Sequence, residues 1–182
     1  MKVLAGGDSF VWGSELSDSP HGGPNGYSKK TFPAQLSKKE YCCVAYPGIG
    51  NKEIVHRILS HLAWAKKPNL VIVCWTWPSR DNELDSDVHI KTLQEHLEYH
   101  NIPYLFTCAD NCVVTGKLDY TNWFMFPAGT EEWQTKDPRG FYQWARENKY
   151  PVGKELHPLE EAHAAAAQLL KDKINEMVKE YI

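Results

Sequence analysis

The stretch that decides the fold is Val3-Leu4-Ala5 together with Gly7-Asp8-Ser9-Phe10-Val11-Trp12-Gly13, which follows it closely. The short apolar run predicts a β-strand, and the glycine after it predicts a turn. Such a turn holds the Ser9 hydroxyl at the carboxyl edge of a sheet, where open α/β sheets bind their ligands. Ser9 is therefore a candidate nucleophile, provided that a base lies near enough to take its proton.

Strands and helices alternate along the rest of the chain. Further strands are predicted at 41–46, 69–75 and 103–107, and helices at 52–66, 88–100 and 158–181. The last helix is the clearest, because Pro158 suits its first position and Glu160 and Glu161 fall in its first turn. This alternation predicts an α/β fold with a mostly parallel sheet covered on both faces.

The length of 182 residues fits one domain, expected over 1–182, with an aromatic-rich insertion at about 118–151. The net charge of −3 lacks the basic excess of a nucleic-acid binder. No apolar run approaches the roughly 20 residues that cross a bilayer, and no secretion signal precedes the first strand. Five cysteines are an odd number, which favours free thiols. We therefore expect a cytoplasmic protein whose partner is a small molecule, neither nucleic acid nor membrane.

A second motif, His157-Pro158, stands just before the final helix. A histidine brought in by the last loop of a domain, at the N-cap of that helix, is a suitable general base for a serine. Together, Ser9 and His157 suggest a serine hydrolase.

Glycines follow the second predicted strand, in Tyr46-Pro47-Gly48-Ile49-Gly50-Asn51. The backbone N–H groups of Gly48 and Ser9 are candidates to hold the oxyanion of an acyl-transfer reaction. The alternative is a plain tight loop in which Asn51 caps the next helix.

These segments resemble three of the four sequence blocks of the SGNH, or GDSL, hydrolases: Gly7-Asp8-Ser9 with Gly13, the Gly48 loop, and His157-Pro158. The resemblance spans nearly the whole chain and is greatest to short intracellular members encoded by tailed bacteriophages. It implies a three-layer α/β/α sandwich of flavodoxin-like type. It also implies Ser9 as nucleophile, His157 as general base and then acid, an acyl-enzyme intermediate, ester substrates that include acylated sugars, and no cofactor.

The third block departs from the family pattern. A glycine-rich segment with an oxyanion-binding asparagine is expected after the third strand, but the chain has Thr76-Trp77-Pro78-Ser79-Arg80-Asp81-Asn82 there. Arg80, Thr76 and Asn82 are candidates for the missing donor, and Arg80 is also suited to a substrate carboxylate or phosphate. We expect substrate-binding residues among Asp8, Asn51, Thr76 and Arg80.

The triad acid also departs. The family places an aspartate three residues before the histidine, where this chain has Lys154. Glu155, or a backbone carbonyl, is the candidate to hold the imidazole instead.

Two alternatives to an ester hydrolase stay open. One is a catalytically weak or inactive module that binds a glycan or a protein partner, and the other is an acyltransferase, in which a second hydroxyl replaces water. His96 and His100 lie one helical turn apart, but no third ligand is evident, so we predict no metal site.

Overall fold

The structure is a computed structural model that describes residues 1–19, 26–37, 40–81, 85–128 and 137–180; the side chains of residues 178–180 lie outside the description. Asn82, one of the candidate donors, also lies outside the described residues.

A parallel sheet of four strands forms the centre of the fold. The strands are β1 (Lys2–Gly6), β2 (Glu40–Cys43), β3 (Leu70–Trp75) and β4 (Tyr104–Cys108), in the order β2-β1-β3-β4. In the central pairings Val3 lies opposite Tyr41 on one side and Leu70 on the other. Because all strands run in parallel, their carboxyl ends meet at one edge of the sheet.

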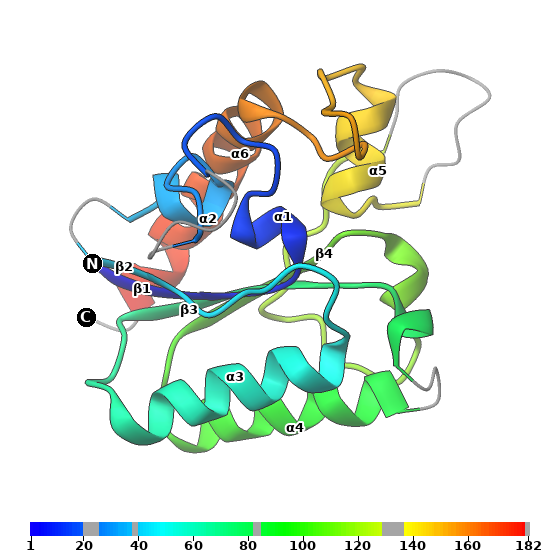
Figure 1. The fold of residues 1–182 in the computed structure, drawn as a ribbon. Helices are drawn as coiled ribbons and strands as arrows, with labels where there is room; N and C mark the ends of the chain where they lie inside the picture. Colours follow the sequence, from blue (N-terminus) through cyan, green and yellow to red (C-terminus); the bar gives the residue numbers. More distant parts are fainter. Residues whose placement is uncertain (20–25, 38–39, 82–84, 129–136, 181–182) are drawn as a thin grey trace.

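Helices cover both faces of the sheet, as Figure 1 shows. One face is covered by α3 (Asn51–Trp64) and α4 (Ser86–Tyr99), and the other by α1 (Ser9–Trp12), α2 (Phe32–Gln35), α5 (Phe141–Glu147) and α6 (Glu160–Glu180). The predicted three-layer α/β/α sandwich with a parallel sheet is confirmed.

The core is split by the sheet into two apolar layers. Leu4, Val71 and Val73 belong to the layer beneath α3 and α4, whereas their neighbours Val3 and Ile72 belong to the opposite layer. Every residue of β3 is buried, which explains its unbroken apolar sequence.

The predicted helices at 52–66 and 88–100 correspond to α3 and α4. The last helix begins at Glu160 rather than Pro158, because Pro158 forms an antiparallel β-bridge with Val152. His157 is therefore not the N-cap of that helix, contrary to the prediction. The second strand ends at Cys43, three residues before its predicted end. In the described part of the chain, no helix is both long enough and apolar enough to cross a membrane.

Candidate active site

The turn after β1 carries Ser9. Asp8 is the N-cap of α1, because its Oδ1 accepts a hydrogen bond from the Phe10 N–H at 3.0 Å. Only glycine fits at position 7, since a Cβ there would approach Val11 Cγ2 to 2.5 Å. Ser9 is the first residue of α1, so its N–H has no partner inside the helix.

His157 is paired with Glu15. Its Nδ1 lies 2.9 Å from Glu15 Oε2, and the two side chains are only 14% and 15% exposed. Beside an ionised carboxylate, Nδ1 is the nitrogen that donates, which leaves Nε2 as the atom able to accept a proton. Glu15 therefore holds the imidazole in the tautomer that a general base requires.

The Glu15 carboxylate also anchors the loop that carries His157. The backbone N–H of Glu155 lies 3.0 Å from each Glu15 oxygen, and the N–H of His157 lies 3.4 Å from Oε2. Partial desolvation raises the pKa of Glu15, but these hydrogen bonds outweigh it and lower the pKa below its usual value. Gly153 makes room for the carboxylate, since a Cβ there would lie 2.4 Å from Glu15 Cδ.

Glu155 is not the carboxylate beside His157. Its side chain is exposed, and only its backbone N–H takes part, as a donor to Glu15. The prediction of Glu155 as triad acid is therefore wrong on geometry. The chain turns at residues 154–155 and Leu156 has φ of 64°, so Glu155 presents its backbone N–H, and not its carboxylate, to the site.

The fold brings His157 to the Ser9 turn. The His157 ring packs edge-on against the ring of Phe10, the residue after Ser9, with centroids 5.5 Å apart. A charge on His157 also acts on Asp8, the residue before Ser9. Ser9 Oγ forms no hydrogen bond with His157 or any other described residue. Residues from opposite ends of the chain thus meet, but without a serine–histidine hydrogen bond.

The loop after β2 reaches the same edge of the sheet. The Tyr46 N–H donates to the carbonyl of Gly7 at 3.2 Å, which ties this loop to the Ser9 turn. Gly48 has φ of 79°, in the left-handed region that favours glycine, and it is exposed. No atom within 4 Å would meet a Cβ at Gly48, so its glycine serves the turn and not a close contact.

The segment after β3 binds Asp8. Asp8 Oδ2 accepts hydrogen bonds from Thr76 Oγ1 at 2.7 Å and from Arg80 Nη1 at 2.9 Å. Burial raises the pKa of Asp8, and the bonds from Thr76 and Arg80 oppose that shift. The Arg80 guanidinium also lies over the ring of Trp77, with its Cζ 5.2 Å from the ring centroid.

Asn51 joins the connections after β2 and β3. Its Nδ2 donates to the Thr76 carbonyl at 3.0 Å and to Ser86 Oγ at 3.1 Å, and its Oδ1 accepts from the Thr76 N–H at 3.0 Å. Asn51 is the first residue of α3 rather than its cap. Instead, Asp81 accepts the hydrogen bond of the Lys52 N–H at 3.0 Å.

The predicted substrate-binding residues therefore divide into two kinds. Asp8, Asn51 and Thr76 are buried, at 0%, 0% and 1% exposure, and their polar side-chain atoms bond to one another or to neighbouring protein groups. These three side chains hold the turn and the connections beside it together, and their role in substrate binding stays a prediction. The Arg80 side chain is 29% exposed and stays accessible.

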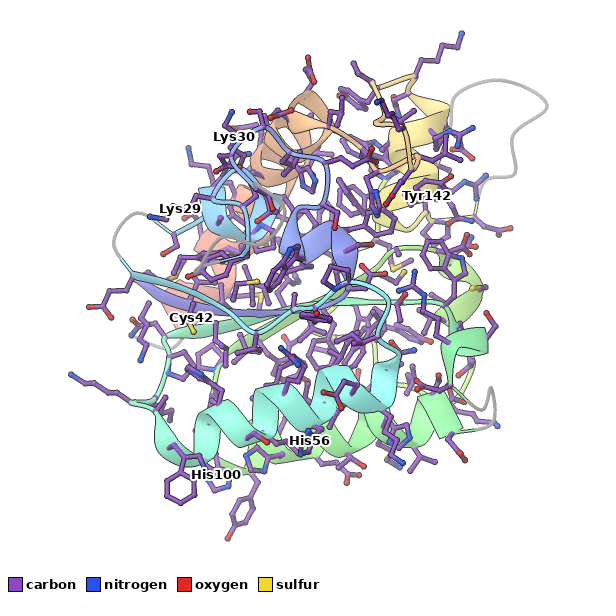
Figure 2. All side chains as sticks on the ribbon, in the orientation of Figure 1. Lys29, Lys30, Cys42, His56, His100 and Tyr142 are labelled. Carbon is purple, nitrogen blue, oxygen red and sulfur yellow. The ribbon has the colours of Figure 1, made fainter. Side chains whose placement is uncertain are left out.

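Three aromatic rings flank the Ser9 turn. Phe10 stacks on Tyr142 with centroids 5.6 Å apart, and Trp77 lies 5.9 Å from each of them. Trp77 and Tyr142 are partly exposed, whereas Phe10 is buried. Figure 2 shows Tyr142 on α5, on the same side of the sheet as α1. From the described residues of the aromatic-rich insertion, the Tyr142 ring lies at the site, while Phe126, Phe141 and Trp144 lie in the core.

Within the described part of the chain, other titratable side chains form no comparable site. His96 and His100 have ring centroids 4.5 Å apart at the end of α4, on the far side of the sheet from Tyr142. Among the described residues, no group of three or more His, Cys, Asp or Glu side chains is arranged to hold a metal ion.

Comparisons with known proteins give one informative result. No protein-family model matches the chain, and no curated protein matches it. Among solved structures, the chain is similar to the psychrotrophic esterase EstA from Pseudoalteromonas sp., in a structure inhibited by monoethylphosphonate. The TM-score is 0.60, the match covers 99% of this chain and 97% of that one, and the sequences are 12% identical. At this identity the similarity shows a shared fold and carries no catalytic residue across.

Glu15 is the site residue that the sequence analysis missed. It lies two residues beyond Gly13, the left-handed residue that ends α1, and has φ of 67° itself. The signal available was a carboxylate close behind the Ser9 motif, in a turn sharp enough to bring it back toward the site.

Proposed function

We propose that the protein is a serine hydrolase of SGNH type, an esterase or deacylase acting on a small ester or an acylated sugar. The observation that carries this proposal is the 2.9 Å contact between Glu15 Oε2 and His157 Nδ1. A buried structural histidine needs only a hydrogen-bond partner. A partly exposed histidine braced by a carboxylate, beside a serine at a sheet edge, has the arrangement of a general base.

In the first half of the reaction, His157 Nε2 takes the proton of Ser9 Oγ as the oxygen attacks the acyl carbon. The tetrahedral oxyanion is held by the N–H groups of Ser9 and Gly48. His157 then returns its proton to the leaving alcohol as the carbon–oxygen bond breaks. The product of this half is an acyl group on Ser9.

In the second half, His157 takes a proton from water, which attacks the acyl-enzyme. The tetrahedral intermediate collapses, the acid leaves, and Ser9 regains its proton from His157. Glu15 stays ionised throughout and stabilises the imidazolium. Serine–histidine hydrogen bonds are often long before substrate binds, so the missing Ser9 bond is compatible with this sequence.

The surroundings of the turn support the substrate class. Trp77 and Tyr142 present partly exposed rings, on which a sugar or an apolar acyl group packs well. We propose no cofactor, no nucleic-acid partner, no membrane partner and a cytoplasmic location.

The direct test is hydrolysis of p-nitrophenyl acetate by the wild type and by Ser9→Ala. We expect the wild type to exceed the uncatalysed rate by orders of magnitude and Ser9→Ala to lose nearly all of that excess. Equal rates for the two proteins would overturn the proposal and favour a binding module. The same assay is repeated with sugar alcohols added as acceptors. If the product is an acylated sugar alcohol and not free acetate, the protein is an acyltransferase.

A further inference from the structure

We propose that Arg80 is a positioning residue that locks the Ser9 turn against the Gly48 loop. This inference rests on the proposed function, because it assigns Arg80 to the two backbone groups that would hold the oxyanion. Arg80 acts through its neighbours and is not itself assigned a contact with the substrate.

The contacts that carry the inference all come from one nitrogen. Arg80 Nη1 donates to Asp8 Oδ2 at 2.9 Å and to the Ile49 carbonyl at 3.3 Å. Asp8 directly precedes Ser9, and Ile49 directly follows Gly48. One guanidinium therefore bridges the two residues adjacent to the proposed oxyanion donors.

Other contacts between the Gly48 loop and the Ser9 segment lie before Gly48, where the Tyr46 ring packs edge-on against the Trp12 ring with centroids 5.4 Å apart. Gly48 itself is exposed, and nothing would lie within 4 Å of a Cβ there. The Tyr46 N–H bond to the Gly7 carbonyl joins the two segments on the strand side. Beyond Gly48, Arg80 links this loop to Asp8, the residue that precedes Ser9.

Asp8 has partners besides Arg80, so removing Arg80 is expected to change the position of the loop without unfolding the turn. Asp8 keeps its bonds from Thr76 Oγ1 at 2.7 Å and from the Phe10 N–H at 3.0 Å when Arg80 is removed. The cap of α1 therefore survives, and what is lost is the connection to Ile49. The stacking on Trp77 fixes the guanidinium plane, which favours arginine over lysine at this position.

Arg57 is a matched control. Arg57 lies in α3, and like Arg80 it binds the connection after β2: its Nε donates to the Val44 carbonyl at 2.7 Å, and its Cζ lies 5.2 Å from the centroid of the Tyr46 ring. No bond joins Arg57 to the described residues of the Ser9 turn. Arg57→Ala and Arg80→Ala each remove one arginine–carbonyl bond to the connection after β2. Only Arg80→Ala removes the bridge.

The experiment measures activity and loop coupling in Arg80→Ala, Arg80→Lys, Arg57→Ala and the wild type. For p-nitrophenyl acetate, we expect kcat of Arg80→Ala to fall about 10- to 100-fold with little change in KM, since a misplacement of about 1 Å costs on this order. Arg80→Lys should recover part of the loss, and Arg57→Ala should stay within about threefold of the wild type. A rise in KM with kcat unchanged in Arg80→Ala, or an equal fall in kcat in Arg57→Ala, would overturn the inference.

Amide hydrogen exchange tests the same inference without any activity. The Tyr46 N–H, bonded to Gly7, should exchange about tenfold or more faster in Arg80→Ala, while the Val44 N–H, bonded to the Ala5 carbonyl at 2.9 Å, should not change. Unchanged exchange at Tyr46 would contradict the bridge. If the wild type hydrolyses no ester, the proposed function fails, while the exchange rates still decide whether Arg80 couples the loops. Should Arg80→Ala not fold, Arg80→Gln serves the same measurements.

Discussion

Glu15 Oε2 lies 2.9 Å from His157 Nδ1, although the two residues are 142 positions apart in the chain. The acid that braces the histidine thus comes from the N-terminal segment that also carries Ser9. In the family that the sequence resembles, the acid and the histidine share one C-terminal block. Here the N-terminal segment supplies both the candidate nucleophile and the carboxylate, and the C-terminal loop supplies only the base.

Glu15→Gln should reduce kcat/KM for p-nitrophenyl acetate by about 10²- to 10⁴-fold, because the neutral amide neither fixes the tautomer nor stabilises the imidazolium. Glu155→Gln should change kcat/KM by less than about twofold, since its side chain is exposed. The two variants carry the same chemical change, but Glu15 contacts the His157 ring, whereas Glu155 is only its neighbour in the sequence. Equal effects would contradict the assignment of Glu15.

Gly153→Ala should damage activity more than stability. The added Cβ would lie 2.4 Å from Glu15 Cδ, so the carboxylate must shift away from the His157 ring. We expect kcat to fall about tenfold or more while the melting temperature changes by a few degrees. Gly116→Ala, where no atom within 4 Å meets a Cβ, is the control. If Gly153→Ala keeps the wild-type kcat, the position of the Glu15 carboxylate beside His157 is not needed for activity.

Acid should destabilise the protein through His163, because burial lowers its pKa to about 3 from 6.5. Its Nδ1 accepts a hydrogen bond from the Phe32 N–H at 3.2 Å, so the ring must stay neutral. Between these two pKa values the unfolded chain binds more protons than the folded one. The free energy of unfolding therefore falls as pH is lowered from about 6.5 toward 3, by up to about 1.4 kcal/mol per pH unit from this group.

Urea unfolding of the wild type and His163→Gln at a series of pH values measures this contribution. Glutamine still accepts a hydrogen bond but does not titrate, so the difference in unfolding free energy between the two proteins should shrink as the pH falls below 6.5. A difference that is constant with pH would contradict a neutral, buried His163.

Asn51→Ala should lower stability without direct damage to the chemistry. The amide of Asn51 satisfies the N–H and the carbonyl of Thr76 inside the protein. Each buried backbone group left without a partner costs about 1–3 kcal/mol. Thermal unfolding should show a large drop in melting temperature. A drop no greater than that of Lys52→Ala, an exposed neighbour in α3, would show that water replaces the amide.

Periodicity in the sequence was enough to predict the sheet and the long helices. β3 is buried along its whole length, so its apolar run carried an unambiguous signal, and α3 and α4 are long enough to show a repeating apolar stripe. The helices α1 and α2 have four residues each, little more than one helical turn, so they show no repeating apolar pattern in the sequence. The start of α6 was misplaced because Pro158 fits a first helical turn and a β-bridge equally well.

The site was predicted only where a motif was local. Ser9 and His157 each stand in a short recognisable segment, and the fold brings these segments to one place. The partner of His157 was not predictable from spacing, because it depends on how a turn with two positive φ values, at Gly13 and Glu15, folds back over the sheet edge. Asp8, Thr76 and Asn51 were predicted as substrate-binding residues. The sequence could not show that their side chains are buried and hydrogen-bonded to other protein groups.

The most direct test of the account is covalent labelling by a fluorophosphonate, read by mass spectrometry of the intact protein and its peptides. We predict one adduct on Ser9 in the wild type, none in Ser9→Ala, and slower labelling in His157→Ala. An adduct on another residue, or labelling that persists in Ser9→Ala, would contradict the central claim that Ser9 is a nucleophile activated by His157.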